Sequence, residues 1–184
     1  MVGLQNENNH GTMHKNRAGG NLNLTQLLSD HKISFRQKFI EALAKKNSCT
    51  AEQAEEEFRD FIGQYADDKY KHVQKLVDRI NETMKPVFLN IRRDRMREDK
   101  CKICESNEPN VKAIEKEYGE SVEFFEVIED MPAGALYQVI FHEEAEEKKL
   151  PLTAVINRGE VLKFWAGKSV DAAVYRIYIN KCLG

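Results

Sequence analysis

Helical spacing of apolar positions dominates the first half of the chain. Apolar residues three and four apart predict three or four helices between about 22 and 84, where no proline interrupts the pattern. Ser34 and Thr50 each open a capping-box pattern, and Asp67 or Asp68 is placed to cap a third helix. We expect these helices to bury their apolar stripes against one another or against the second half of the chain. They carry no chemical motif.

After Lys85 the pattern changes to short apolar runs that are typical of strands. Runs at 86–91, 122–128, 152–156 and 161–165 predict four strands, and a turn at 157–159 predicts a hairpin between the last two. Helical patterns follow the cysteines near 104, cover about 133–149, and end the chain after Ser169, which we expect to cap the last helix. The predicted order is β-α-β-α-β-β-α.

Composition and charge narrow the class of protein. The chain has 184 residues, of which 41% are hydrophobic and 32% charged, so a packed core can form under a highly charged surface. A net charge of −2 does not indicate the basic surface that is typical of proteins that bind nucleic acid. Residues 1–20 are rich in Gly, Asn and His and predict a disordered tail rather than a signal peptide. No apolar run approaches the roughly 18 residues of a membrane helix. We therefore expect a cytoplasmic protein without a membrane or nucleic-acid partner.

The four cysteines are Cys49, Cys101, Cys104 and Cys182. Because the cytoplasm is reducing, a C-x-x-C pair there is more often catalytic or metal-binding than structural. The three-residue spacing of Cys101 and Cys104 brings the second sulfur back over the first turn of a helix, within reach of a disulfide.

Four features in order make the second half resemble the thioredoxin superfamily, over roughly residues 86–184. A strand leads to Cys101-Lys102-Ile103-Cys104 at a helix start, and Pro109 follows where the family kinks that helix. Pro151 stands at the head of the third strand, where the family has a cis-proline, and Gly159 and Gly167 fall in its closing hairpin. The resemblance implies an α/β thioredoxin-like fold, a mixed central sheet flanked by helices, with 21–85 as an N-terminal all-helical extension.

The chain also departs from the family pattern. Lys100 stands where a tryptophan is common, Lys102-Ile103 replaces Gly-Pro, and the loop before the cysteines is about five residues longer than usual. Asn90 aligns with a buried acid that can relay protons to the deeper thiol. Asparagine cannot titrate, so either the exchange is tuned differently here or the alignment is offset by one residue.

The resemblance also implies roles for individual residues. Cys101 is the exposed nucleophile and Cys104 the resolving thiol, while Leu150 and Pro151 present backbone to a substrate strand. The N-terminus of a helix lowers the pKa of a thiol placed there. Lys100 and Lys102 modulate the pKa of Cys101 in the same direction. Three nearby acids oppose them, and the sign of the sum stays open: Glu98, Asp99 and Glu105.

The function that the resemblance implies is thiol–disulfide exchange with protein substrates, catalysed by the C-x-x-C pair. Such an enzyme needs no bound cofactor or metal, and a reductase or a small thiol supplies its electrons. The sequence leaves the substrate, the direction of electron flow, the oligomeric state and the role of the helical region open.

Alternatives to the enzyme stay open at this point. In one alternative, the cysteine pair is half of a zinc site. Residues distant in the sequence, or another subunit, would then complete the site: Cys49, Cys182, His72 or His142. In another alternative, the fold serves only for binding, and the protein is an adaptor whose helical region recognises a partner. In a third alternative, four arginines between 92 and 97 bind nucleic acid or an anionic ligand, but the acids among them favour a solvated loop: Arg92, Arg93, Arg95 and Arg97.

Overall fold

The computed structural model describes residues 22–141 and 149–184, and within them it has a mixed α/β fold. The predicted fold class is confirmed at that level: six α-helices and a short 3₁₀ helix surround a five-stranded mixed sheet in the described residues. In chain order the elements are β1 (Leu22–Asn23), α1 (Leu24–Asn47), α2 (Ala51–Glu57), α3 (Arg59–Glu82), β2 (Val87–Arg92), α4 (Lys102–Tyr118), β3 (Glu123–Ile128), η1 (Pro132–Ala135), α5 (Leu136–Phe141), β4 (Leu152–Asn157), β5 (Glu160–Ala166) and α6 (Ala172–Leu183).

The strands lie in the order β1-β5-β4-β2-β3, with β2 between a parallel and an antiparallel neighbour. Asn90 on β2 is paired with Glu126 on β3 and with Thr153 on β4. Parallel strands need a crossover connection, and α4 supplies it between β2 and β3. The cysteines at the start of α4 are thereby carried to the end of β2.

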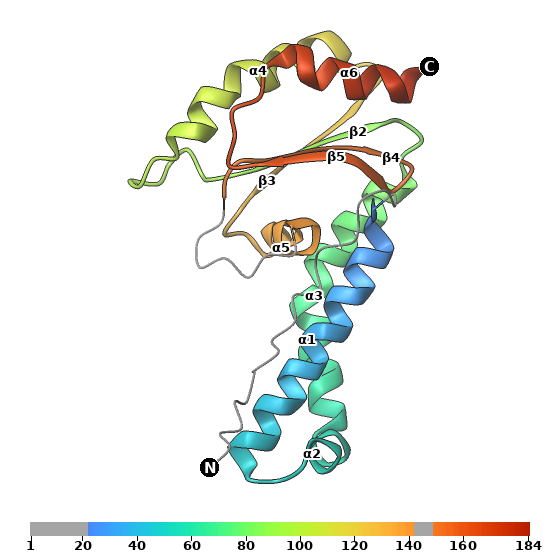
Figure 1. Ribbon diagram of the computed structural model, residues 1–184, viewed down its shortest axis with the longest axis vertical. Coiled ribbons are helices and arrows are strands. Elements are labelled where there is room, and N and C mark those ends of the chain that lie inside the picture. The colour runs from blue at the N-terminus through green and yellow to red at the C-terminus, as the bar shows by residue number, and fades with distance from the viewer. Residues whose placement is uncertain (1–21, 142–148) are drawn as a thin grey trace, which may run out of the picture.

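Helices cover both faces of the sheet (Figure 1). Side chains of a strand alternate between faces, so Val87, Leu89 and Ile91 pack into the core shared with α1, α3 and α5. Phe88 packs into the second core, beneath α4 and α6. The same alternation assigns Asn90 and Arg92 to the α4 side.

Helices α1 and α3 form a long hairpin that runs away from the sheet, with α2 at its far end (Figure 1). Its near half belongs to the core of the sheet, through residues such as Leu27 and Val77. Its far half has a small core of its own, made of Ile40, Ala44, Ala54 and Ile62. The hairpin is thus half docked and half projecting.

The tip of the β4–β5 hairpin fastens these helices to the sheet. The predicted turn is present, with φ of 50° at Arg158 and 77° at Gly159. The carbonyl oxygen of Gly159 accepts a hydrogen bond of 2.8 Å from the amide of Leu24 at the start of α1. A Cβ at Gly159 would collide with the side chain of Asn81, so glycine is required here by both φ and space.

Several predicted helix boundaries were wrong. Helix α1 begins at Leu24, where the Asn23 side chain accepts the amides of Thr25 and Gln26, so Ser34 lies inside the helix. The earlier Asn is a strong cap, and no breaker separates it from Ser34. The Thr50 capping box is confirmed, with Gln53 completing it.

Two further caps differ for similar reasons. Helix α3 begins at Arg59, immediately after α2, so Asp67 and Asp68 lie within it. The last helix is capped by Asp171, whose carboxylate accepts the amide of Ala173, rather than by Ser169. A side-chain acceptor caps the helix only when it lies next to the first free amides.

Parts of two predictions fall outside the described residues. The predicted tail at 1–20 does so entirely, and the predicted helix at 133–149 is seen as η1 and α5 as far as Phe141. His142, a candidate zinc ligand, is also outside. Among the described helices, none combines the length and apolar character that crossing a membrane requires.

Candidate functional site

The predicted cysteine pair lies at the N-terminus of α4. Cys101 is the N-cap residue, and its sulfur accepts a hydrogen bond of 3.2 Å from the amide of Cys104. The two residues form a disulfide, with Cα atoms 5.2 Å apart. Cys101 is half-buried, whereas Cys104 is only 4% exposed. An incoming thiol therefore has better access to the first sulfur than to the second.

Leu150 and Pro151 lie beside this disulfide, and the peptide bond between them is cis. The Cys101 sulfur is 3.9 Å from the carbonyl oxygen of Leu150. In the disulfide that sulfur has no proton to donate, so the approach is a contact and not a hydrogen bond. Pro151 lines a small cavity together with Cys104. Their role in binding a substrate stays a prediction.

The two lysines predicted to modulate the pKa of Cys101 are both exposed. Lys100 donates from Nζ to the carbonyl oxygen of Arg95 at 2.7 Å, and it lines a cavity of about 200 Å³ with Cys101. Lys102 is the first residue of α4. Lys100 thus shares a cavity with Cys101, Lys102 adjoins Cys101 only in the chain, and the effect of both lysines on its pKa stays a prediction.

The arginine-rich loop before the cysteines is fixed by ion pairs. Arg95 donates both terminal nitrogens to Glu126 at 3.0 and 3.1 Å, and Arg97 pairs with Asp99 and with Asp130 at 2.7 and 2.9 Å. The hydrogen bond from Arg97 holds the pKa of Asp99 below its ordinary value. The cations of this loop are therefore largely matched by neighbouring acids.

Arg92 is the exception, and its prediction as part of a solvated loop was wrong. It is the last residue of β2, and its side chain is 4% exposed. Asn90, two positions earlier on the same face, is 8% exposed. Both residues line a cavity of about 50 Å³ with Cys104 and Pro151. The period-two pattern continuing from Phe88 through Asn90 to Arg92 could have placed Arg92 on this face of the strand, but it does not show that α4 covers that position.

A buried hydrogen-bond network holds α4 in place on the sheet. Asn107, one turn after Cys104, donates to the Tyr175 hydroxyl at 3.0 Å and accepts the amide of Val170 at 2.8 Å. That hydroxyl also lies 3.0 Å from Thr153 Oγ1 on β4. Burial raises the pKa of Tyr175. The network joins α4, β4 and α6, and no pattern in the sequence indicates it.

The described residues do not assemble a metal centre from three or more His, Cys, Asp or Glu side chains. Cys49 lies at the far end of the helical hairpin, and Cys182 lies on α6, where it donates to the Tyr178 carbonyl oxygen at 3.2 Å. Both are free cysteines. The structure thus does not bring them to the C-x-x-C pair.

Comparison with known proteins gives little further guidance. No protein-family model matches the chain, and no curated protein is similar to it. Among solved structures, the chain is similar to the thioredoxin-like protein Trxlp from Edwardsiella tarda EIB202, at 15% identity and a TM-score of 0.40. The match covers 56% of this chain and 91% of that one. The function has to be inferred from the residues of the site.

Proposed function

We propose that this chain is a thiol–disulfide oxidoreductase with a thioredoxin-like domain at about 86–184, which exchanges disulfides with protein substrates. The observation that carries the proposal is the disulfide between half-buried Cys101 and buried Cys104 at the first turn of α4. The mixed sheet with helices on both faces is the architecture that the family resemblance implies.

The chemistry needs one reachable sulfur and one protected sulfur. A substrate thiolate attacks Cys101, the bond to Cys104 breaks, and Cys104 leaves as a thiolate; the second substrate thiol then attacks the mixed disulfide and frees Cys101. In the opposite direction, the Cys101 thiolate opens a substrate disulfide and Cys104 resolves the intermediate. The amide of Cys104 donates to Cys101 and supports negative charge on that sulfur.

We further propose that the substrate strand lies along Leu150 and Pro151, next to the exposed sulfur. The carbonyl oxygen of Leu150 is already within 3.9 Å of the Cys101 sulfur, so a bound strand would lie against both. Lys100 and Lys102 would tune the reactivity of Cys101. In the reductive direction, electrons would come from a reductase or from small thiols, and no bound cofactor takes part in this exchange.

The test is a redox titration of the full chain in dithiol buffers of graded potential. Free thiols are trapped and counted by mass, and bound zinc is assayed in the same samples. We expect a reversible two-electron transition of Cys101 and Cys104 in the range of about −180 to −300 mV. Cys101→Ser should abolish both this transition and the reduction of a protein disulfide, while Cys49→Ser should change neither. A chain that holds zinc on this pair, or forms no disulfide there, would overturn the proposal.

An adaptor function is the second candidate, because aromatic side chains are exposed on the helical hairpin. Phe61 and Tyr65 are 52% and 45% exposed, and both rings contact Phe39. A docking surface of this kind serves an adaptor as well as an enzyme. If the wild-type chain binds a partner but Cys101→Ser changes none of its activities, the adaptor is favoured.

A further inference from the structure

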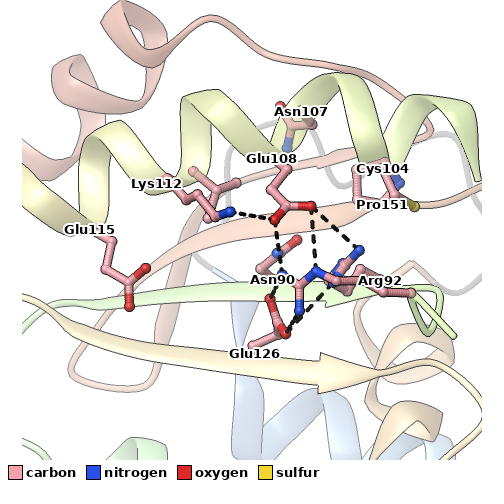
Figure 2. A pocket seen from close by; sticks show the side chains of 11 residues that line it. Asn90, Arg92, Cys104, Asn107, Glu108, Lys112, Glu115, Glu126 and Pro151 are labelled. Carbon is pink, nitrogen blue, oxygen red and sulfur yellow. Dashed lines mark hydrogen bonds and ion pairs between the residues drawn. The ribbon is translucent and has the colours of Figure 1, made fainter.

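Arg92 is a buried cation next to the candidate site. Its backbone ends β2, and its side chain, 4% exposed, extends beneath α4. Figure 2 shows it between the strand that carries Asn90 and the helix that carries Cys104 and Glu108. Removing a guanidinium from water is costly unless partners replace the lost hydration. The partners of Arg92 therefore decide what its charge can do.

Those partners compensate Arg92 only in part. Its closest carboxylates are Glu108 and Glu126, each 3.8 Å away, which is beyond hydrogen-bond distance. Other cations hold the same carboxylates more closely: Lys112 lies 2.7 Å from Glu108, and Arg95 lies 3.0 Å from Glu126. Nη1 of Arg92 makes no hydrogen bond within the described residues. Arg92 thus keeps positive charge and a spare donor inside the protein.

That spare charge shares two cavities with the deeper cysteine. Arg92 and Cys104 line the same two cavities, of about 50 and 200 Å³. The first is also lined by Asn90, whose buried side-chain oxygen has no hydrogen-bond partner in the described residues and cannot titrate. The site therefore presents a fixed cation, and no buried acid on β2, to Cys104.

The remaining charged groups around the two cavities are more exposed than Arg92, and they come in both signs. In the first cavity they are Glu108, Lys112 and Glu115 from α4, Glu126 from β3, and Arg95. In the second they are Arg93, Asp94, Arg95, Lys100, Glu105 and Glu108. Water screens exposed charges far more than buried ones, so Arg92 should dominate the field at Cys104.

We propose that Arg92 is a positioning residue that stabilises the thiolate of Cys104 and thereby favours the reduced pair over the disulfide. The inference rests on the proposed oxidoreductase function and assigns a direction to it, the oxidation of substrate dithiols. The substrate's two sulfurs become a disulfide and lose two electrons. The Cys101–Cys104 bond breaks and takes up that pair, and Cys104 leaves as a thiolate. Of the two protons released by the substrate thiols, one is taken up by the Cys101 sulfur and one goes to solvent. A more stable leaving thiolate also speeds attack on Cys101.

The decisive measurement is the ionisation of each cysteine in the fully reduced wild-type chain. The Cβ chemical shift of a cysteine reports its thiolate residue by residue in an NMR titration. We expect Cys104 to ionise below the roughly 8.5 of a free cysteine, although burial alone would push its ionisation to higher pH. If Cys104 stays protonated through that pH, the inference is overturned. This result needs no variant, so a failure of any variant to fold leaves it decisive.

Substitution then tests whether Arg92 is the cause. Arg92→Met keeps much of the volume and removes the charge, and we expect the neutral-pH thiolate fraction of Cys104 to fall on the order of tenfold. The dithiol–disulfide equilibrium should shift tenfold toward the disulfide, which corresponds to about 30 mV. Arg92→Lys keeps the positive charge, so it should retain most of the wild-type thiolate fraction of Cys104 and most of the wild-type preference for the dithiol. Arg93→Met removes a more exposed arginine that lines the second cavity and pairs with Asp99 and Glu129, which do not pair with Arg92, so it should change each by less than about twofold.

Failure of this inference is distinguishable from failure of the proposed function. A wild-type chain without a reversible disulfide defeats the oxidoreductase itself. A chain with a reversible disulfide, in which Arg92→Met and Arg93→Met behave alike, keeps the oxidoreductase and removes Arg92 from its mechanism.

Discussion

The two ends of the molecule bury different kinds of side chain. The four buried polar or charged residues of the described chain all lie on β2, β4 or α4: Asn90, Arg92, Asn107 and Thr153. The far end of the helical hairpin buries only apolar groups in its small core. Burying a polar group costs free energy unless it is well partnered. These buried polar residues thus lie in the elements around the disulfide, whereas the small core of the hairpin is held by apolar packing alone.

The hairpin end also leaves large apolar side chains outside its core. Phe39 and Tyr65 stack with ring centroids 4.7 Å apart, and Phe35 stacks on both rings at about 6 Å. These contacts hold α1 against α3 where no sheet supports them. A region with so small a core should open locally at lower free energy than the sheet. The comparison therefore predicts that the two ends can be perturbed separately.

The largest expected effect comes from the small core. Ile62 is fully buried there, and Ile62→Ala should cost about 3 kcal/mol through lost burial and a cavity. Because the damage is local, hydrogen exchange of amides in α2 and the adjoining turns of α1 and α3 should accelerate by roughly a hundredfold. The redox equilibrium of Cys101 and Cys104 should not move. Ile33→Ala, at an exposed isoleucine on α1, is the control and should change neither quantity. A shift of the redox equilibrium in Ile62→Ala that is absent from Ile33→Ala would refute the separation.

At the disulfide end, the corresponding test is Asn107→Ala. The substitution leaves the Val170 amide without its partner and the Tyr175 hydroxyl with Thr153 alone, at a cost of about 2 kcal/mol. Here the cost should appear in global unfolding by urea, since the network joins α4, β4 and α6. The rate of disulfide exchange should fall as well, because α4 carries both cysteines. Asn110→Ala loses a longer bond of 3.3 Å to the Ala172 amide and should cost less than half as much.

The parts of the fold that the sequence predicts are those set by local pattern. Short apolar runs marked β2 to β5 in the sequence. These runs, the Asn157-Arg158-Gly159 turn and the Thr50 capping box depend only on neighbours in the chain. The cysteine pair was found because three residues of helix bring two sulfurs together. The structure also places Leu150 and Pro151 beside them.

The features that could not be predicted from the sequence depend on tertiary contacts. The two-residue strand β1 exists only because Leu22 and Asn23 pair with Val161 and Glu160, far along the chain. The burial of Arg92 was hidden by the arginines after it, because their sequence does not show where β2 passes beneath α4. The partners of Asn107 come from residues more than sixty positions away. Each of these depends on packing between elements, which local pattern does not contain.

The smallest expected effect lies where the hairpin meets the sheet, at Tyr70. Its hydroxyl is 2.6 Å from Nδ1 of His31, and burial raises its pKa to about 12. An unfolded tyrosine ionises near pH 10, so the unfolded chain loses this proton first. The contribution of protonated Tyr70 to the free energy of unfolding is therefore fully present below about pH 10, and it is lost as the pH rises toward 12. Tyr70→Phe should cost about 1 kcal/mol at neutral pH, for the lost hydrogen bond, and should flatten this alkaline decline in urea unfolding. Tyr65→Phe, at an exposed ring beyond the junction, should leave the decline intact. An unchanged decline in Tyr70→Phe would mean that alkali acts first elsewhere in the chain and not on this contact between α1 and α3.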